Sequence, residues 1–424
     1  MGFGDFVRRH AADTRPLAIP AYRRLWAGQG VSFIGFQLTS VAVSAQIYEI
    51  TKSSFWVGML GPANLIPLVV FGLWGGAIAD AVDRRRLLMI GALIAWSGTL
   101  ALLVQAALGS TGVGLLLATV AVHATGFAIT GPTRGAIIPR LVPADLIPAA
   151  NTLNFLVGGL GTVIGPLVGG VVLAQSGFAT AYLIDALLFG AGFYAAVRLP
   201  RLEPVGEVTR PGLRSVVDGL RYVSGHPVVL MSFVVDLIAM AFALPRALFP
   251  EIVDERFGGS LVAFGWLSAS IAIGSVLGGL LSGWVGRVRR QGLALTYVIA
   301  AWGLTVAAAG LAEQLWLMVA LLAFGGAADL VSAVWRQTIL QTHAPDDMRG
   351  RMQGVFMVVV AGGPRLGDLR AGGTASWLGA TWAWVGGGIA CAVAVVAVGL
   401  AVPAFRKYRP SRGAFGQLGK DLAS

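Results

Sequence analysis

Apolar runs of about twenty residues recur along this chain from Leu25 to Val402, and they constrain its fold more than any other feature. A helix of that length crosses the roughly 30 Å hydrocarbon core of a bilayer. A transmembrane β-barrel would instead show shorter segments of alternating polarity. Only 12% of the 424 residues are charged, too few to cover the surface of a soluble protein. The sequence therefore predicts an all-α membrane protein.

The basic residues indicate how the chain crosses the membrane. Twelve spans can be placed, near residues 24–48, 56–80, 86–108, 112–138, 148–174, 178–198, 227–250, 260–284, 291–311, 315–342, 350–376 and 380–402. The side of the membrane that holds both termini then receives 26 of the 31 Lys and Arg residues. This asymmetry predicts that both termini are cytoplasmic. The net charge of +11 is then a determinant of topology in contact with anionic lipids, not a nucleic-acid surface.

The two halves of the chain resemble each other at an offset of 202 residues. Arg134 aligns with Arg336, and Pro143 aligns with Pro345 nine residues later. The longest polar connection lies between the sixth and seventh spans. We therefore predict an N-terminal bundle of six helices over residues 1–198, a cytoplasmic linker over 199–226, and a C-terminal bundle with a basic tail over 227–424. Two pseudo-symmetric bundles of like orientation are typical of transporters that handle substrate between their halves.

Glycine strips mark one face of several predicted helices. Gly161, Gly165 and Gly169 recur every four residues on the fifth helix, and shorter or similar strips occur on the second, eighth and eleventh helices. Small residues let membrane helices approach closely, so we expect the two halves to meet along these four helices. The alternative is ordinary packing of helices within the membrane, with no moving part. Pro166 interrupts the strip and is expected to kink its helix.

Two of these stretches resemble motifs of the major facilitator superfamily. The stretch "GGAIADAVDRRRLL" is similar to the signature G-x-x-x-D-R-x-G-R-R and matches it at Gly76, Asp80, Arg84 and Arg85. Ala81 and Asp83 depart from it. The stretch "GTVIGPLVGG" resembles the helix 5 motif of drug:proton antiporters, with matches at Gly161, Gly165, Pro166, Gly169 and Gly170. By this resemblance, Asp80 controls a conformational contact with the helix that begins near residues 349–353.

The resemblance is closest to the branch of the superfamily that contains the enterobactin exporter and the macrolide efflux proteins. It rests on "VAVSAQIYEIT", "FWVGML", "GWLSASIAIGSVLGGLLSG" and "QTILQTHAPDDMRGRMQGV", and it extends from about Tyr22 to Ala404. It implies the major facilitator fold with twelve transmembrane helices, in the inner membrane of a bacterium. It also implies export of a siderophore or of an amphiphilic, drug-like small molecule. A monomer is expected.

Ionisable side chains inside the spans are candidates for proton coupling, because they are costly in lipid unless they face a partner or water. Asp236 and Asp329 are predicted near mid-depth, and His123 lies slightly further out. The alternative is a set of structural ion pairs, such as Asp236 with Arg246 or Asp368 with Arg365 or Arg370. Asp185 is interpreted as a packing residue.

Polar and aromatic groups that could contact the substrate form a second set. Its members are Gln37, Ser44, Gln46, Asn64, Arg246 and Trp335. Hydrogen bonds between helices explain the same residues without any substrate.

The function predicted from the sequence is secondary transport. No nucleotide-binding, metalloprotease or serine-hydrolase motif occurs, and Cys391 is the only cysteine. We therefore expect no enzyme activity, no cofactor and no metal site. The expected partners are a small-molecule substrate, protons and membrane lipids. The preferred interpretation is a proton antiporter with alternating access. An importer or uniporter of the same fold, or a non-transporting receptor or scaffold, remains as an alternative.

Overall fold

The chain folds into helices throughout the part that the structure describes. The computed structural model describes residues 13–81, 83–200, 221–343 and 349–408, and no β-strand occurs within these ranges. Ten helical intervals are long and apolar enough to cross a membrane. One of them, Ala144–Val197, has 54 residues, far more than the roughly twenty that one crossing needs. The all-α membrane class is confirmed, and the predicted count of twelve helices agrees approximately.

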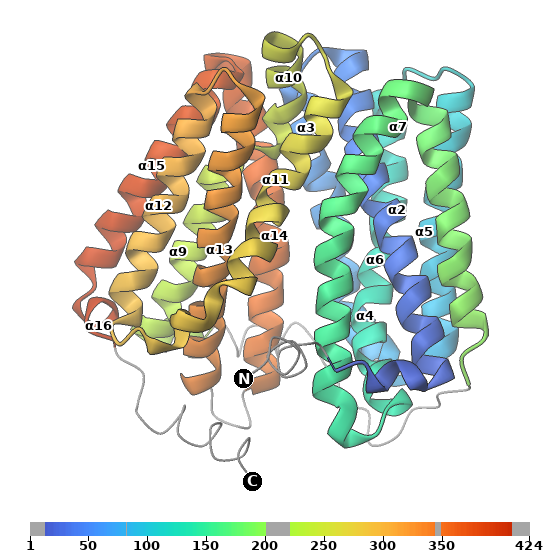
Figure 1. Cartoon of the computed structure of the whole chain (residues 1–424), viewed down its shortest axis with the longest axis horizontal. Helices are drawn as coiled ribbons and strands as arrows, with labels where there is room; N and C mark the ends of the chain where they lie inside the picture. The colour runs from blue at the N-terminus through green and yellow to red at the C-terminus, as the bar shows by residue number, and fades with distance from the viewer. Residues whose placement is uncertain (1–12, 82, 201–220, 344–348, 409–424) are drawn as a thin grey trace, which may run out of the picture. The chain divides into compact units, whose positions relative to one another are not determined.

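The chain divides into two compact units. Unit 1 comprises residues 1–43 and 66–211, and unit 2 comprises residues 44–65 and 212–424. The helices that supply unit 1 are α2 (Pro20–Thr51), α4 (Leu60–Ala81), α5 (Arg84–Ala107), α6 (Val113–Leu141) and α7 (Ile147–Val197), with the short η1 (Arg15–Ala18) and η2 (Ala144–Leu146) (Figure 1). The backbone of α7 leaves helical geometry at Gly177, where φ is +74°. Glycine adopts such a φ readily, and Gly177 marks the break between the predicted fifth and sixth spans. At Pro166 the backbone stays helical.

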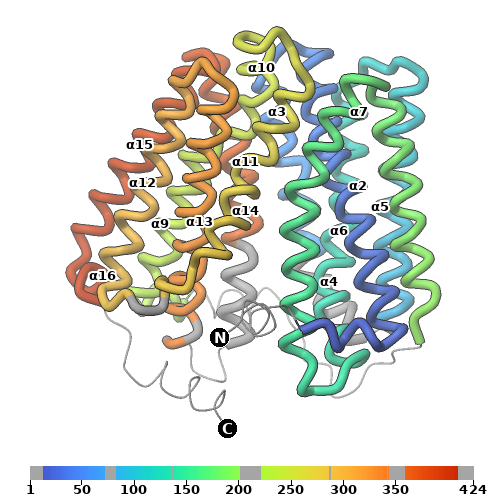
Figure 2. Tube along the Cα trace, viewed as in Figure 1, coloured from blue at the N-terminus to red at the C-terminus, as the bar shows by residue number. Residues whose placement is uncertain are grey.

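Unit 2 is built from more and shorter elements. They are α3 (Ser54–Gly58), α9 (Pro227–Ala243), η3 (Arg246–Leu248), α10 (Phe249–Phe257), α11 (Leu261–Leu280), η4 (Ser282–Arg287), α12 (Gln291–Leu311), α13 (Leu315–His343), α14 (Arg349–Leu378), α15 (Ala380–Ala401) and α16 (Pro403–Arg406) (Figures 1 and 2). The predicted seventh span extends to residue 250, but α9 ends earlier. Pro245 keeps Leu244 extended, with φ −100° and ψ +105°. Arg246 therefore lies in η3 and not inside a continuous membrane helix.

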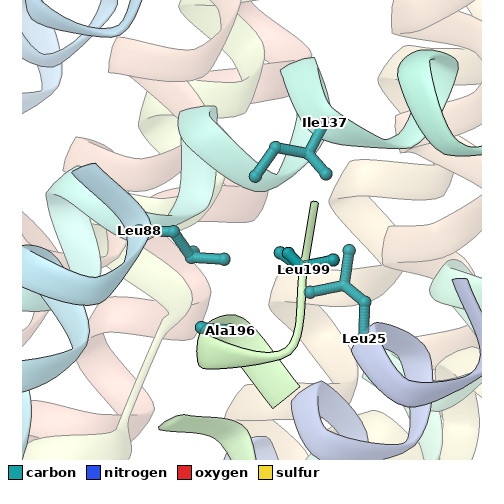
Figure 3. Packing of buried hydrophobic residues seen from close by; sticks show 5 residues of the cluster. All are labelled: Leu25, Leu88, Ile137, Ala196 and Leu199. Carbon is teal, nitrogen blue, oxygen red and sulfur yellow. The ribbon is translucent and has the colours of Figure 1, made fainter. Parts of the chain in front are cut away.

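At one end of unit 1, apolar side chains from four helices pack into a buried cluster. Leu25 and Leu88 lie near the starts of α2 and α5, whereas Ile137 and Ala196 lie near the ends of α6 and α7, with Leu199 just beyond (Figure 3). Each is at most 4% exposed. Starts of some helices thus meet ends of others, as expected for spans that alternate in direction. In lipid this packing contributes mainly van der Waals contacts.

Residues 44–65 belong to unit 2, although the chain on either side of them belongs to unit 1. Their backbone touches that of α14. A Cβ atom on Gly58 would lie 2.7 Å from the Asp368 carbonyl oxygen and 3.1 Å from the Gly372 Cα atom. A Cβ atom on Gly61 would collide with the Arg365 carbonyl oxygen. The predicted N-terminal bundle, residues 1–198, did not anticipate that residues 44–65 pack in unit 2. Because most of the predicted linker lies outside the described residues, the boundaries at 198 and 227 remain a prediction.

The described glycines of three strips approach helices of their own unit, and the expectation that the two halves meet along these helices stays a prediction. Gly161 and Gly165 approach α2, Gly274 and Gly278 approach α13, and Gly363 and Gly367 approach α9. Glycine spacing produces a smooth helix face but does not specify the partner. The surroundings of Gly72 and Gly76 on α4 lie outside what the structure describes. The described contacts of these three strips are close packing within each unit.

Gly165 and Gly158 lie two turns apart on α7 and offer a matched test of this packing. A Cβ atom on Gly165 would collide with the Gln37 Cβ and lie 2.9 Å from the Ile34 carbonyl oxygen, whereas nothing lies within 4 Å of a Cβ on Gly158. We expect Gly165→Ala to lower the free energy of unfolding in detergent by about 1–3 kcal/mol. Gly158→Ala should be neutral or slightly stabilising, since alanine is the better helix former. Equal effects of the two substitutions would contradict this assignment.

Candidate functional site

A buried ion pair joins α9 to α13 in the interior of unit 2. Asp236 on α9 is 2% exposed and Arg336 on α13 is 5% exposed. The Arg336 Nη1 atom contacts the Asp236 Oδ2 atom directly. Asp236 follows nine apolar or small residues from the start of α9, so the helix itself places this carboxylate well inside the membrane-spanning segment.

A second carboxylate lies beside the same arginine. Asp329 precedes Arg336 by seven residues on α13, about two helical turns, so both project from one face. The distance from Arg336 Nη2 to Asp329 Oδ1 is 3.8 Å. Ser332 lies between them: its carbonyl oxygen accepts from Arg336 Nε at 3.4 Å, and its hydroxyl donates to the Asp329 carbonyl oxygen at 2.7 Å. We call Asp236, Arg336 and Asp329 the carboxylate–arginine triad.

The charge balance of the triad decides what it can do chemically. Two ionised carboxylates and one guanidinium carry a net charge of −1, and one added proton makes the group neutral. A buried charge without a partner is costly, so such a group favours uptake of a proton when it is enclosed and release when it meets water. Among the described residues, no three His, Cys, Asp or Glu side chains gather as a metal site.

Four further ionisable residues that the sequence placed inside predicted spans lie in the same unit. Arg365 Nη1 is 3.8 Å from Asp368 Oδ2, which is one of the predicted structural pairs. Arg246 is exposed, and its charge is close enough to interact with Asp329 and Asp368. Arg370 instead donates to the Phe242 carbonyl oxygen at 2.8 Å and thereby ties α14 to α9. The ion-pair partner of Asp236 is thus Arg336, and the alternative pairing with Arg246 is not the one observed.

Sequence reasoning missed Arg336 because of its position near the end of a predicted span. A basic residue there counts toward the positive cytoplasmic side, where arginines usually face water. Two signals could have identified it: the repeat aligns it with Arg134, and it follows Asp329 by two helical turns. In unit 1, Arg134 is half-buried and lies over the Phe127 ring at 5.8 Å.

His123 lies in an aromatic cluster of unit 1 and is only 5% exposed. Its ring is 5.3 Å from Phe36, 6.0 Å from Phe127 and 6.3 Å from Phe189. Within the described residues its Nε2 atom has no hydrogen-bond partner. The structure therefore brings two of the three predicted coupling residues together in one triad and places His123 in the other unit, in apolar surroundings.

The predicted substrate contacts are divided between the units. Gln37 lies in unit 1 against Gly165, whereas Ser44, Gln46, Asn64, Arg246 and Trp335 lie in unit 2. Asn64 donates to the Leu60 carbonyl oxygen of its own helix at 2.7 Å. Trp335 is 2% exposed and donates to the Val285 carbonyl oxygen at 3.0 Å. These contacts fit a packing role for Asn64 and Trp335, and a role in binding substrate stays a prediction.

The loop motif is only partly described. The surroundings of Gly76, and the side chains of Asp80 and of residues 349–353, lie outside the described part of the structure, so the predicted contact of Asp80 stays a prediction. Arg85 donates to the Val197 carbonyl oxygen at 2.6 Å. Asp83 caps α5: its Oδ1 atom accepts from the Arg85 backbone N–H at 2.8 Å. The departure from glycine at this position of the motif thus supplies a helix N-cap.

Comparison with known proteins agrees with this architecture. Residues 11–413 match the family model of the transmembrane secretion effectors within the major facilitator superfamily. The enterobactin exporter EntS of Shigella boydii serotype 18 is 29% identical over 360 residues, which cover 84% of this chain and 85% of that one. EntS of Escherichia coli O139:H28 matches with the same identity and coverage.

Solved structures of other transporters share the fold at low sequence identity. The nucleoside transporter NupG is 14% identical with a TM-score of 0.71, over 92% of this chain and 100% of that one. An inward-facing bacterial homologue of the iron transporter ferroportin is 14% identical with a TM-score of 0.68, over 92% and 99% of the two chains. Both the family and these neighbours are transporters and not enzymes. The chain is therefore a multi-pass membrane transporter that belongs to the transmembrane secretion effector family of the major facilitator superfamily.

Proposed function

We propose that this protein exports a siderophore, or an amphiphilic drug-like small molecule, from the cytoplasm across the inner membrane of a bacterium in exchange for protons. The observation that carries the proposal is the similarity to the enterobactin exporter EntS over 84% of the chain. The buried triad supports proton coupling because its net charge changes by one when a single proton binds.

In this mechanism the triad is exposed alternately to the two sides of the membrane. A proton that enters from outside neutralises the triad, and its release to the cytoplasm restores the net negative charge. The two protonation states then favour different conformations, as any ligand that binds two states unequally shifts their populations. The substrate crosses in the opposite direction, both termini face the cytoplasm, and lipids surround a monomer.

Transport into vesicles tests the proposal. Purified protein is reconstituted into liposomes, and uptake of iron-free enterobactin is measured after a pH gradient is imposed. We expect pH-driven uptake in the wild type, and uptake at the level of empty vesicles for Asp236→Asn and Asp329→Asn, which cannot exchange the proton. Exchange of labelled for unlabelled enterobactin without a gradient should survive in both variants. Asp145→Asn, an exposed acid beyond the end of α6, is the matched control.

The same assay separates the other transport modes. A uniporter would move enterobactin down its own gradient without any response to pH. An importer would respond to a pH gradient of the opposite sign. Undiminished pH-driven uptake in both Asp→Asn variants would reject the triad as the coupling site. If the wild type moves no enterobactin at all, an amphiphilic antibiotic becomes the next probe.

A further inference from the structure

Asp185 is a second buried carboxyl group, in the interior of unit 1, and it is 0% exposed. It lies on α7 after the break at Gly177. The Thr39 hydroxyl on α2 bonds to its Oδ2 atom at 2.6 Å, and the Thr99 hydroxyl on α5 donates to the same atom at 3.1 Å. This carboxyl group therefore connects three helices of unit 1 through a single oxygen.

The other oxygen of Asp185 has no polar partner within the described residues. It points at the backbone of α2, where Gly35 leaves room for it: a Cβ atom on residue 35 would collide with Oδ1 and lie 3.3 Å from the Asp185 Cα atom. Glycine at position 35 thus permits a carboxyl group to be enclosed between two helices in close contact.

No cation compensates this carboxyl group among the described residues, in contrast to the triad of unit 2. The titratable side chains near it are Tyr182, one turn earlier on α7, and His123 on α6. The His123 backbone packs against Gly98, next to Thr99, and its ring lies beside Phe36 and Phe189. Neither side chain forms an ion pair with Asp185. Within the described residues, two neutral hydroxyl groups are therefore the hydrogen-bond partners of this acid.

We propose that Asp185 is a proton-binding site of unit 1, neutral in the arrangement seen here, which exchanges its proton when α2 shifts away from α5 and α7. An ionised carboxylate enclosed without a cation costs several kcal/mol, whereas a neutral acid can donate its proton to the Thr39 hydroxyl, since a hydroxyl also accepts. On separation of the helices, water receives the proton and solvates the carboxylate. The inference rests on the proposed proton coupling and adds a second site to it.

Infrared spectroscopy of the reconstituted protein tests the site without any substrate. The carbonyl stretch of a neutral carboxylic acid lies apart from the stretches of a carboxylate. We expect such a band at neutral pH in the wild type and in the control Asp145→Asn, and its loss in Asp185→Asn. Thr99→Val should shift its frequency, because the Asp185 Oδ2 atom loses a donor, so the test holds even if Asp185→Asn fails to fold.

Two results would overturn the inference. If no band depends on Asp185 or Thr99, the carboxyl group is ionised and only holds helices together. If the band is present but does not respond to raised pH or to D2O, Asp185 is neutral but exchanges no proton. Both results concern Asp185 alone, so they are distinct from failure of enterobactin transport or of the triad.

Discussion

Arg336→Met should lower the free energy of unfolding of this protein by about 3–5 kcal/mol, which is the usual cost of leaving one partner of a buried ion pair without the other. Methionine fills most of the arginine volume, so the lower free energy of unfolding would come from the lost charge and not from a cavity. Asp236, at 2% exposure, would then lack a cation, and Asp329 would lose the same partner. Unfolding of the purified protein in detergent, followed by circular dichroism against denaturant, measures the change.

A second substitution identifies the cause. In the Arg336→Met background, Asp236→Asn removes the more deeply buried of the two carboxylates left without Arg336. It should recover part of the lost stability, so the two changes are non-additive. Arg140→Met, in the last turn of α6 where the side chain is exposed, is the control and should change stability by no more than about 0.5 kcal/mol. If Arg336→Met resembled this control, the pair would carry no uncompensated charge and the triad could not act as described.

Much of the fold could be predicted because lipid imposes simple rules on sequence. Each span must satisfy its own backbone hydrogen bonds, so length and apolar composition indicate a helix directly. The break between the fifth and sixth spans was predictable in the same way: Gly177 lies in the short interval between them, and its positive φ is one that other residues rarely adopt. Asp236 and Asp329 were identified because charges are rare at mid-span.

The neighbour of each helix face could not be predicted. The spacing of residues along a helix shows which of them share a face, but it does not show which other helix packs against that face. The strip through Gly161 and Gly165 indicated close approach correctly, but its partner is α2 of the same unit. Arg336 and Asp236 illustrate the same limit for charge. They lie 100 positions apart in the sequence and meet only because α9 and α13 are packed together.

The packing of residues 44–65 in unit 2 could not be predicted either, and it restricts how the units can move. Both ends of this segment continue into unit 1, through α2 and α4. The segment is held in unit 2 by polar contacts: the Ser54 hydroxyl bonds to the Glu251 carboxylate, and the Tyr48 hydroxyl donates to Asp254 Oδ2 at 3.2 Å. Lys52, with a φ of +48°, lies 3.5 Å from Asp254. Any displacement of one unit relative to the other must bend α2 and α4 or release these contacts.

A reversible covalent bridge across these contacts should abolish transport. Cysteines at positions 54 and 251 are introduced in a Cys391→Ala background, which removes the only native cysteine. They are joined by a short bifunctional methanethiosulfonate reagent, whose bonds to the protein break on reduction. We expect enterobactin uptake by reconstituted vesicles to fall to the level of empty vesicles on cross-linking and to return when the bridge is reduced.

Each single-cysteine variant, treated with the same reagent, is the control and should keep its activity, because modification of one side leaves the segment free to separate. Full uptake by the bridged protein would mean that residues 44–65 stay with unit 2 throughout the cycle and that α2 and α4 bend instead. Loss on bridging would mean that α3 must leave α14, where Gly58 and Gly372 bring the two backbones together. That contact has no side chains to interlock, so it can separate without the rotamer changes that bulky residues would require.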